Sequence, residues 1–137
     1  MQNYFQVEMD QDALKKMSVL GLAHMGDCVF ELLVRSYLCL HGRETSGNLH
    51  RATVAMVAAP AQARRMERML PLLTEQELAL YRRGRNAHVH GVPKNATPGE
   101  YAKATGLECL FGALFLQGQT ARINELFTLT MEENHAV

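Results

Sequence analysis

Apolar residues between Leu22 and Leu40 recur at intervals of three and four positions, and this spacing constrains the fold more than any other feature of the chain. The members of the series are Leu22, Met25, Val29, Leu33, Tyr37 and Leu40. Such spacing places one apolar stripe along a single helix face, which has to be buried against other elements. His41 and Gly42 then provide a stop signal. The sequence therefore predicts one long helix with a single buried face.

Capping and turn signals mark further helices. Thr74 and Thr97 each begin a Thr-x-x-Glu capping box, in which the two side chains satisfy free backbone N–H groups of the first helical turn. The remaining signals are a cap at Ser46, a proline at Pro60 that ends that helix or starts the next, and a break at Gly118 before a last helix. Residues 86–96 lack a helical period, which is typical of a loop. We predict one all-α domain over residues 1–137, without strands.

Two acidic residues interrupt otherwise apolar helical segments. Asp27 follows Gly26, and Glu108 stands one turn before Gly112, so each acid has a glycine that would let another helix approach closely. Two unpaired carboxylates meeting between helices would repel each other unless a cation lay between them. Oxygen ligands suit Mg²⁺, which can activate a water for attack on a phosphate. We therefore predict that Asp27 and Glu108 are buried, catalytic and metal-ligating.

The alternative is that each acid pairs with a base of this chain. Arg35 or Lys103 could neutralise one of the carboxylates, which is the commoner arrangement for a single buried acid. Glu31, one turn after Asp27, is expected to form an i,i+4 salt bridge with Arg35, and a part in a metal site is its second interpretation. Spacing along the chain does not show that the two helices meet, so both interpretations stand.

The chain has a formal net charge of zero, but its charges are unevenly distributed. Residues 35–103 hold eleven Lys and Arg against five Asp and Glu, whereas the two ends together hold three bases and nine acids. This polarity is compatible with a basic middle that faces an anion. Solvated helix faces without any partner explain the same pattern equally well.

Basic and amide side chains cluster at the end of one predicted helix and in the loop after it. They are Arg83, Arg85, Asn86 and Lys94. Groups so placed can reach phosphates and 2′-hydroxyls without contacting base edges, as binding of double-stranded RNA requires. The alternative is that the arginines compensate the helix dipole. His88 and His90 are too few for a metal site, so their role, like that of Glu31, stays open. The arginines of 64–68 are expected to form a solvated face.

Composition limits the cellular setting. No apolar run approaches the ~20 residues that cross a bilayer, and the N-terminus lacks the apolar segment of a secretion signal. The cysteines, Cys28, Cys39 and Cys109, are odd in number and lack CxxC spacing. They fit reduced thiols in a protein core better than a disulfide framework or a zinc site. The expectation is a cytoplasmic protein with no membrane partner.

The two acidic segments resemble the ribonuclease III family. LAHMGDCVFE (22–31) resembles the family's glycine–aspartate helix, and ATGLECLFGALFL (104–116) resembles its second acidic motif. RRGRNA (82–87) and PKN (93–95) are similar to motifs of the Mini-ribonuclease III branch, which has the catalytic domain without a double-stranded-RNA-binding domain. The motifs occur in the family's order, and the resemblance covers roughly residues 20–116.

The resemblance implies a homodimeric, ribonuclease III-like helical endonuclease that cuts both strands of double-stranded RNA and leaves 5′-phosphate ends. The larger family has two further acids in each site where this chain has Ala23 and Thr105, and the Mini branch also lacks them. One Mg²⁺ per subunit at Asp27 and Glu108 is therefore expected. The resemblance further implies maturation of large-subunit (23S) ribosomal RNA precursors, and it leaves room for a ribosomal protein as a further partner.

Two other functions stay open on the sequence. A catalytically silent helical dimer that binds RNA or ribosomal protein fits the two missing carboxylates, and Mg²⁺-dependent cleavage of a duplex distinguishes it from the enzyme. A helical protein-interaction module whose basic middle meets an acidic partner would show neither metal binding nor salt-sensitive RNA affinity.

Overall fold

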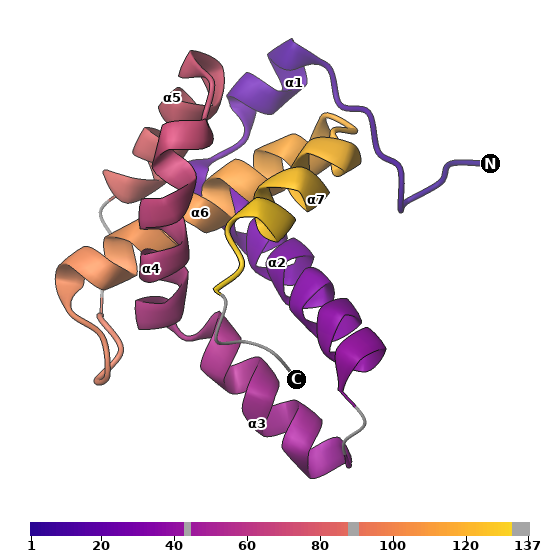
Figure 1. Cartoon of the computed structure of the whole chain (residues 1–137). Helices are drawn as coiled ribbons and strands as arrows, with labels where there is room; N and C mark the ends of the chain where they lie inside the picture. Colours follow the sequence, from indigo (N-terminus) through magenta and orange to yellow (C-terminus); the bar gives the residue numbers. More distant parts are fainter. Residues whose placement is uncertain (43–44, 88–90, 133–137) are drawn as a thin grey trace.

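The computed structural model of the chain describes residues 1–42, 45–87 and 91–132. Secondary structure within these ranges is helical, without strands, which confirms the predicted all-α class (Figure 1). The helices are α1 (Gln11–Lys16), α2 (Val19–His41), α3 (Ser46–Val57), α4 (Ala59–Met69), the short 3-10 helix η1 (Leu70–Leu72), α5 (Glu75–Arg85), α6 (Pro98–Leu116) and α7 (Thr120–Leu129).

Side-chain caps fix where several of the helices begin. The capping boxes predicted at Thr74 and Thr97 are both formed: each threonine hydroxyl accepts from the N–H of a glutamate three residues on, whose carboxylate accepts from the threonine N–H. The cap predicted at Ser46 is wrong by one residue, because Thr45 caps α3. Pro60 lies in the first turn of α4, where its missing N–H removes no helical hydrogen bond.

Helix α6 is the centre of the fold, and α2, α4, α5 and α7 pack against it (Figure 1). Its side chains from Ala104 to Leu116 are almost all buried, as a helix surrounded by other helices requires. Phe111 of α6 contacts Phe30 of α2 edge to face, and Phe30 meets Phe127 of α7 in the same way, with both pairs of ring centroids 6.0 Å apart. These aromatic contacts join three of the helices in one core.

The buried stripe of α2 is only partly the predicted one. Leu22 and Val29 are buried as expected, but the stripe then continues through Val34 and Leu38. Leu40, predicted to be buried, is 82% exposed. Buried residues in the second half of α2 recur at every fourth position, so the stripe turns slowly around the helix and leaves Leu40 outside it.

Two glycines let α2 and α6 touch backbone to backbone. A Cβ atom placed on Gly26 would lie 1.6 Å from the carbonyl oxygen of Glu108, and one on Gly112 would lie 2.0 Å from the carbonyl oxygen of Leu22. Any larger residue would push the two helices apart. The close approach predicted from these glycines is therefore confirmed, and it fixes the neighbouring residues of α2 and α6 relative to each other.

All three cysteines are free thiols, but only Cys109 lies in the core. Cys28 and Cys39 are exposed on α2, so the expectation of core thiols is wrong for these two. The reason is again the turning stripe of α2, which buries other positions of that helix. Within the described ranges, no helix is both long and apolar enough to pass through a bilayer.

Candidate active site between α2 and α6

Asp27 and Glu108 meet where α2 crosses α6. Gly26, which directly precedes Asp27, lies against the main chain of Glu108, so the two acids stand on touching turns of the crossing helices. Their carboxyl groups are close enough to share a hydrogen bond. The fold thus brings together two acids that are far apart in the sequence.

The two carboxyl groups differ in exposure. Glu108 is half-buried and Asp27 is exposed, so the expectation that both acids are buried is wrong for Asp27. The reason is geometric: Asp27 stands one residue after the buried Gly26, and one residue turns the helix by about 100°. The acidic pair is therefore open to solvent on the side of Asp27, where a ligand can reach it.

Burial is the main cause that raises the pKa of Glu108 to about 8, and the negative charge of Asp27 acts in the same direction. A side-chain hydrogen bond with Gln62 opposes these two effects and lowers the pKa of Glu108. At neutral pH Glu108 therefore keeps its proton unless a cation takes the place of that proton. A pair of acids in this setting is a site where a divalent cation would be stabilising.

The bases that could have neutralised the acids are paired with other residues. Arg35 bonds Glu31, with 2.9 Å between Nη2 and Oε2, which confirms the expected i,i+4 salt bridge. Lys103 forms an ion pair with Glu67. Within the part of the chain that the structure describes, no ion pair joins a base to either acid of the crossing. The alternative in which Arg35 or Lys103 neutralises one of the two acids is thereby removed.

A solvent-open hollow of about 640 Å³ lies along α2 beside Asp27. It is lined by His24, Met25, Asp27, Cys28, Glu31, Leu32 and Arg35. Among the described residues, no three or more His, Cys, Asp or Glu side chains form a group suited to a metal. Mg²⁺ needs fewer, because it takes one or two carboxylates from a protein and keeps several waters. Two carboxylates therefore suit Mg²⁺ better than zinc, whose sites take three or four protein ligands, mostly His and Cys.

The two positions at which the larger family has further acids supply no oxygen here. Ala23 is buried and has no polar side chain. Thr105 is also buried, and its hydroxyl donates to the carbonyl oxygen of Tyr101 at 3.0 Å. The acids available at the crossing are therefore the two that the sequence analysis singled out.

Gln62 of α4 is a neighbour of the acidic pair that the sequence analysis does not identify. Gln62 is 3% exposed, and its side chain lies close enough to Glu108 to lower the pKa of that carboxyl group. A signal exists in the sequence: Gln62 shares its spacing with Met66 and Met69, which are fully buried on the inner face of α4. A polar residue in that register is expected to have a polar partner in the core.

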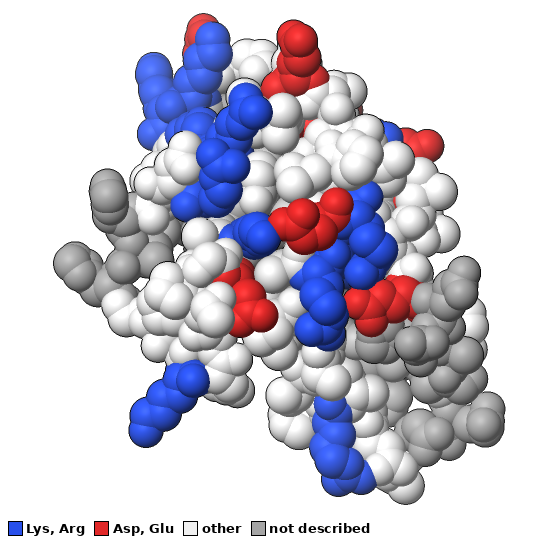
Figure 2. Space-filling view, turned by 60° about the vertical axis from the view of Figure 1, so that its left-hand side comes forward, with Lys and Arg blue, Asp and Glu red and all other residues white. Residues whose placement is uncertain are grey.

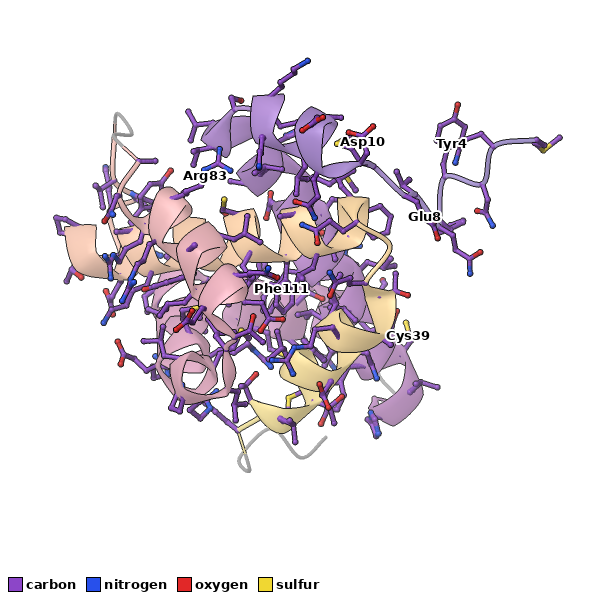
Figure 3. All side chains as sticks on the ribbon, turned by 90° about the horizontal axis from the view of Figure 1, so that it is seen from above. Tyr4, Glu8, Asp10, Cys39, Arg83 and Phe111 are labelled. Atoms are coloured by element: carbon purple, nitrogen blue, oxygen red, sulfur yellow. The ribbon has the colours of Figure 1, made fainter. Side chains whose placement is uncertain are left out.

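The residues predicted to hold RNA lie at the end of α5 and in the segment after it. Arg85, Asn86 and Lys94 are exposed. Arg83 is half-buried and turns toward α1, where it donates to the carbonyl oxygen of Met17 at 3.4 Å (Figure 3). The structure thus brings three of the four to the surface and directs the fourth toward the protein body.

Arginines of α4 have structural partners, although basic and acidic side chains are interspersed over this side of the molecule (Figure 2). Arg65, expected on a solvated face, is 4% exposed. It lies over the Phe127 ring and donates to the Phe127 carbonyl oxygen at 2.9 Å, while Arg68 donates to that of Thr130. Both cap the C-terminal end of α7, so the expectation is wrong for them. Residues 88–90, which include the two histidines without an assigned role, lie outside the described residues.

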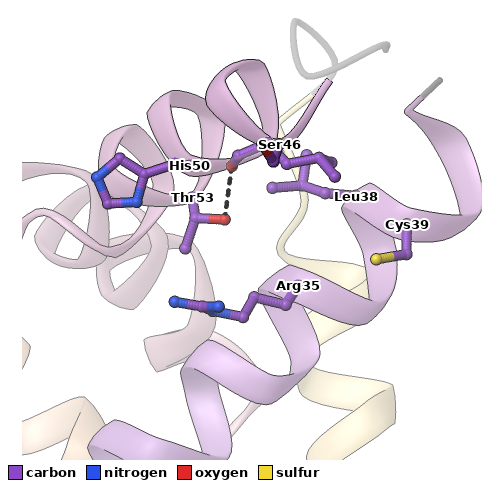
Figure 4. A pocket seen from close by; sticks show the side chains of 7 residues that line it. Arg35, Leu38, Cys39, Ser46, His50 and Thr53 are labelled. Carbon is purple, nitrogen blue, oxygen red and sulfur yellow. Dashed lines mark hydrogen bonds between the residues drawn. The ribbon is translucent and has the colours of Figure 1, made fainter. Parts of the chain in front are cut away.

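A smaller hollow of about 230 Å³ lies between α2 and α3 (Figure 4). It is lined by Arg35, Leu38, Cys39, Ser46, Leu49, His50 and Thr53. The Thr53 hydroxyl donates to the Leu49 carbonyl oxygen at 2.8 Å, so its proton is not available to a ligand. The catalytic interpretation therefore depends on the larger hollow, which contains Asp27.

Known proteins are similar to this chain in sequence and in fold. A sequence model of the ribonuclease III domain matches residues 20–119, which include both acids of the crossing. Mini-ribonuclease 3 of Symbiobacterium thermophilum is 47% identical over 78% of this chain and 82% of that protein. Mini-ribonuclease 3 of Enterococcus faecalis is 43% identical over 82% of this chain and 86% of that protein. A crystal structure of a Fusobacterium nucleatum protein superimposes with a TM-score of 0.76 at 28% identity, covering 85% of this chain and 93% of that one.

Proposed function

The chain belongs to the ribonuclease III domain family as an endoribonuclease, and from that premise we propose that it cleaves double-stranded RNA with the help of Mg²⁺. The observation that carries the proposal is the meeting of Asp27 and Glu108 without a Lys or Arg partner among the described residues. Two acids in this arrangement favour a bound cation, and hydrolysis of a phosphodiester is a reaction that such a cation assists.

Asp27 and Glu108 would hold the cation from two different helices. When bound, Mg²⁺ supplies positive charge that lowers the pKa of a water molecule and stabilises the leaving oxygen. Glu108 releases its proton as the cation binds, because a protonated carboxyl is a poor ligand. The glycine crossing keeps the backbones of the two acids at a fixed separation, and the exposure of Asp27 leaves the pair open to a substrate phosphate.

Arg85, Asn86 and Lys94 are proposed to hold the duplex by its backbone. All three are exposed, and the Arg85 guanidinium lies 5.6 Å from the centre of the Tyr81 ring, which restricts its position. A-form RNA presents phosphates and 2′-hydroxyls at its surface, so such groups bind it without contacting bases. Arg83 adds its charge at the same helix end, although its side chain turns toward the protein body.

Two copies of the chain are proposed to associate through α2. Leu20 and Leu32 of this helix are each 52% exposed, and Cys28 between them is also exposed. Contiguous apolar patches mark surfaces that another protein covers, and we infer that these side chains of α2 contribute to one. A homodimer formed there would bring two acidic pairs to one duplex, as cleavage of both strands requires. Light scattering should give the mass of two chains for the wild type and of one chain for L32E.

The remaining parts of the proposal come from the resemblance to the Mini-ribonuclease III branch. They are that residues 1–137 form one catalytic domain and that it matures the ends of 23S ribosomal RNA precursors in the cytoplasm. A ribosomal protein bound to that precursor is proposed as a further partner. The support for this part is the identity to the Mini-ribonuclease 3 relatives over most of the chain.

Digestion of a long RNA duplex tests the proposed activity. The wild type should cut the duplex in Mg²⁺ and stop when the cation is chelated. D27N and E108Q each remove one carboxylate, and each should lower the cleavage rate by about three orders of magnitude because several kcal/mol of charge stabilisation are lost. E67Q is the matched control: it removes an exposed acid that pairs with Lys103, and it should cut at the wild-type rate.

Duplex binding, measured by gel shift in Ca²⁺, separates the enzyme from its alternatives. D27N and E108Q should bind the duplex nearly as well as the wild type. A wild type that binds but never cuts would support the silent RNA-binding dimer, which the absence of acids at Ala23 and Thr105 favours. Near-wild-type cleavage by either variant would overturn the assignment of the two acids.

A further inference from the structure

The side chain of Gln62 is buried in the core with its amide held in one orientation. Its Nε2 donates to the carbonyl oxygen of Val57, at the end of α3, at 2.8 Å. Because a carbonyl oxygen only accepts, this bond requires the NH₂ end of the amide to face Val57. Oε1 is then left buried, without a hydrogen-bond partner among the described residues.

An unpaired carbonyl oxygen in a core is unfavourable by about 1–3 kcal/mol. A methionine at position 62 would have a similar length and no such polar atom, and Met66 and Met69 occupy the same face of α4. Packing alone therefore favours an apolar residue at this position. A buried polar group without a hydrogen-bond partner calls for another explanation, such as a role at a nearby site.

The second polar contact of Gln62 supplies that explanation. Nε2 carries two N–H groups, of which one is used by Val57 and the other is available to the Glu108 side chain. Val57 occupies one donor and the second is left for Glu108, so the unpaired Oε1 is the consequence of that orientation. The main chain of α3 fixes the amide, and the amide in turn restrains the carboxyl group of Glu108.

This restraint matters because the acidic pair has few other contacts. Neither Ala23 nor Thr105 contributes an oxygen, and no ion pair of the described residues holds Glu108. We propose that Gln62 is a positioning residue, whose amide holds the Glu108 carboxylate where it and Asp27 can share one divalent cation. The inference rests on the proposed function only in taking that cation to be the one used in cleavage.

Cation binding to the RNA-free protein tests this role without relying on activity. Mn²⁺ is titrated into the wild type, Q62M and the control T53V, and binding is followed by calorimetry. Q62M should bind Mn²⁺ about tenfold more weakly, as expected when a group that orients a metal ligand is removed. Its melting temperature should stay the same or rise, because the unpaired oxygen is gone. T53V, which removes another buried polar group of this region, should leave the Mn²⁺ affinity unchanged.

A purely structural role for Gln62 gives a different pattern. In that case Q62M would melt at a lower temperature and bind Mn²⁺ as the wild type does, and either result overturns the inference. If Q62M does not fold, Q62L replaces it: this variant also lacks N–H donors and adds no charge, so weaker Mn²⁺ binding supports the donor role and unchanged binding overturns it. Raising the Mg²⁺ concentration should restore duplex cleavage by Q62M, which a defect in RNA binding would not allow.

The failure of this inference is distinguishable from that of the proposed function. A wild type that cuts RNA, together with a Q62M variant of unchanged Mn²⁺ affinity, removes the role of Gln62 alone. A wild type that binds Mn²⁺ but cuts no duplex removes the proposed function, while the comparison of Mn²⁺ affinities still decides the role of Gln62.

Discussion

Glu77 and Glu108 are two glutamates in the interior of the fold, and their surroundings are opposite. The carboxylate of Glu77 accepts from Arg122 Nε and Nη2, both at 2.8 Å, and this bonding is the main cause that lowers the pKa of Glu77. Glu108 has no ion pair among the described residues, faces the carboxyl group of Asp27, and has its pKa raised to about 8.

The difference separates an acid that stabilises the fold from one that serves a ligand. Glu77 also completes the capping box of α5, so it supports the structure at pH 7 without any external partner. Glu108 is held in an unfavourable position by the crossing of α2 and α6, and a bound cation would relieve it. Burial alone does not mark an acid as functional: the sign of the nearest charge does.

The largest expected effect is the pH dependence of cation binding. We expect it at Glu108 and not at Glu77, because only the pKa of Glu108 is raised. Because the cation replaces the proton of Glu108, Mn²⁺ affinity should rise about tenfold per pH unit from pH 6 and level off above about pH 8. D27N should shift the plateau to lower pH by removing the adjacent charge. Calorimetric titrations at pH 6, 7, 8 and 9 measure this, and an affinity independent of pH would contradict the raised pKa.

A smaller effect is expected from E77Q, which should act on stability and not on the cation. The loss of the charged hydrogen bonds to Arg122 should lower the free energy of unfolding by about 2 kcal/mol at pH 7. Since the pKa of Glu77 is lowered in the folded state, its contribution is present above the unfolded value of 4.5 and is lost as the pH falls through the folded value. Urea unfolding at pH 7 and pH 3 checks this, with Mn²⁺ affinity as the control.

The smallest effect is expected from E108Q on the cation-free protein, and it has the opposite sign. The raised pKa of Glu108 means that its contribution to stability is fully present below 4.5 and is lost as the pH rises toward about 8. A glutamine at position 108 does not ionise, so E108Q avoids this loss of stability. The free energy of unfolding at pH 9 should rise by about 1–2 kcal/mol, a value that allows for solvent screening of the half-buried carboxyl group. Urea unfolding in EDTA measures it, and destabilisation at pH 9 would place Glu108 beside Glu77 as a structural acid.

Much of the fold follows from local signals that the sequence carries. The capping boxes at Thr74 and Thr97, and the close helix approach at Gly26 and Gly112, depend on interactions that residue types and spacing determine. The identity of the two acids follows from their placement in apolar helices. Their meeting does not, because contact between distant helices depends on how all of the helices pack, and the two glycines allow a close approach without specifying the partner helix.

Misses at Arg65 and Gln62 share one physical cause, whereas Asp27, predicted to be buried, is exposed. A periodic pattern gives the face of a helix, but charged and polar residues are assigned to solvent by default. Arg65 lies on the buried face of α4 because the carbonyl groups at the end of α7 and two aromatic rings receive its guanidinium. Asp27 lies outside because the helix turns away directly after Gly26. Such cases require the partner element, which spacing along one helix cannot supply.

The contact of Gly26 with the main chain of α6 also decides how this protein can be redesigned. No side chain separates the two backbones at this contact. Substitutions elsewhere in the core should therefore change the distance between the two carboxylates very little. The adjustable part is the length of the acid itself: exchanging aspartate for glutamate on one helix, or the reverse on the other, alters the reach by one methylene. The preference for divalent ions of different radius would thus be set by the residues at positions 27 and 108. The other core residues could change without altering that preference.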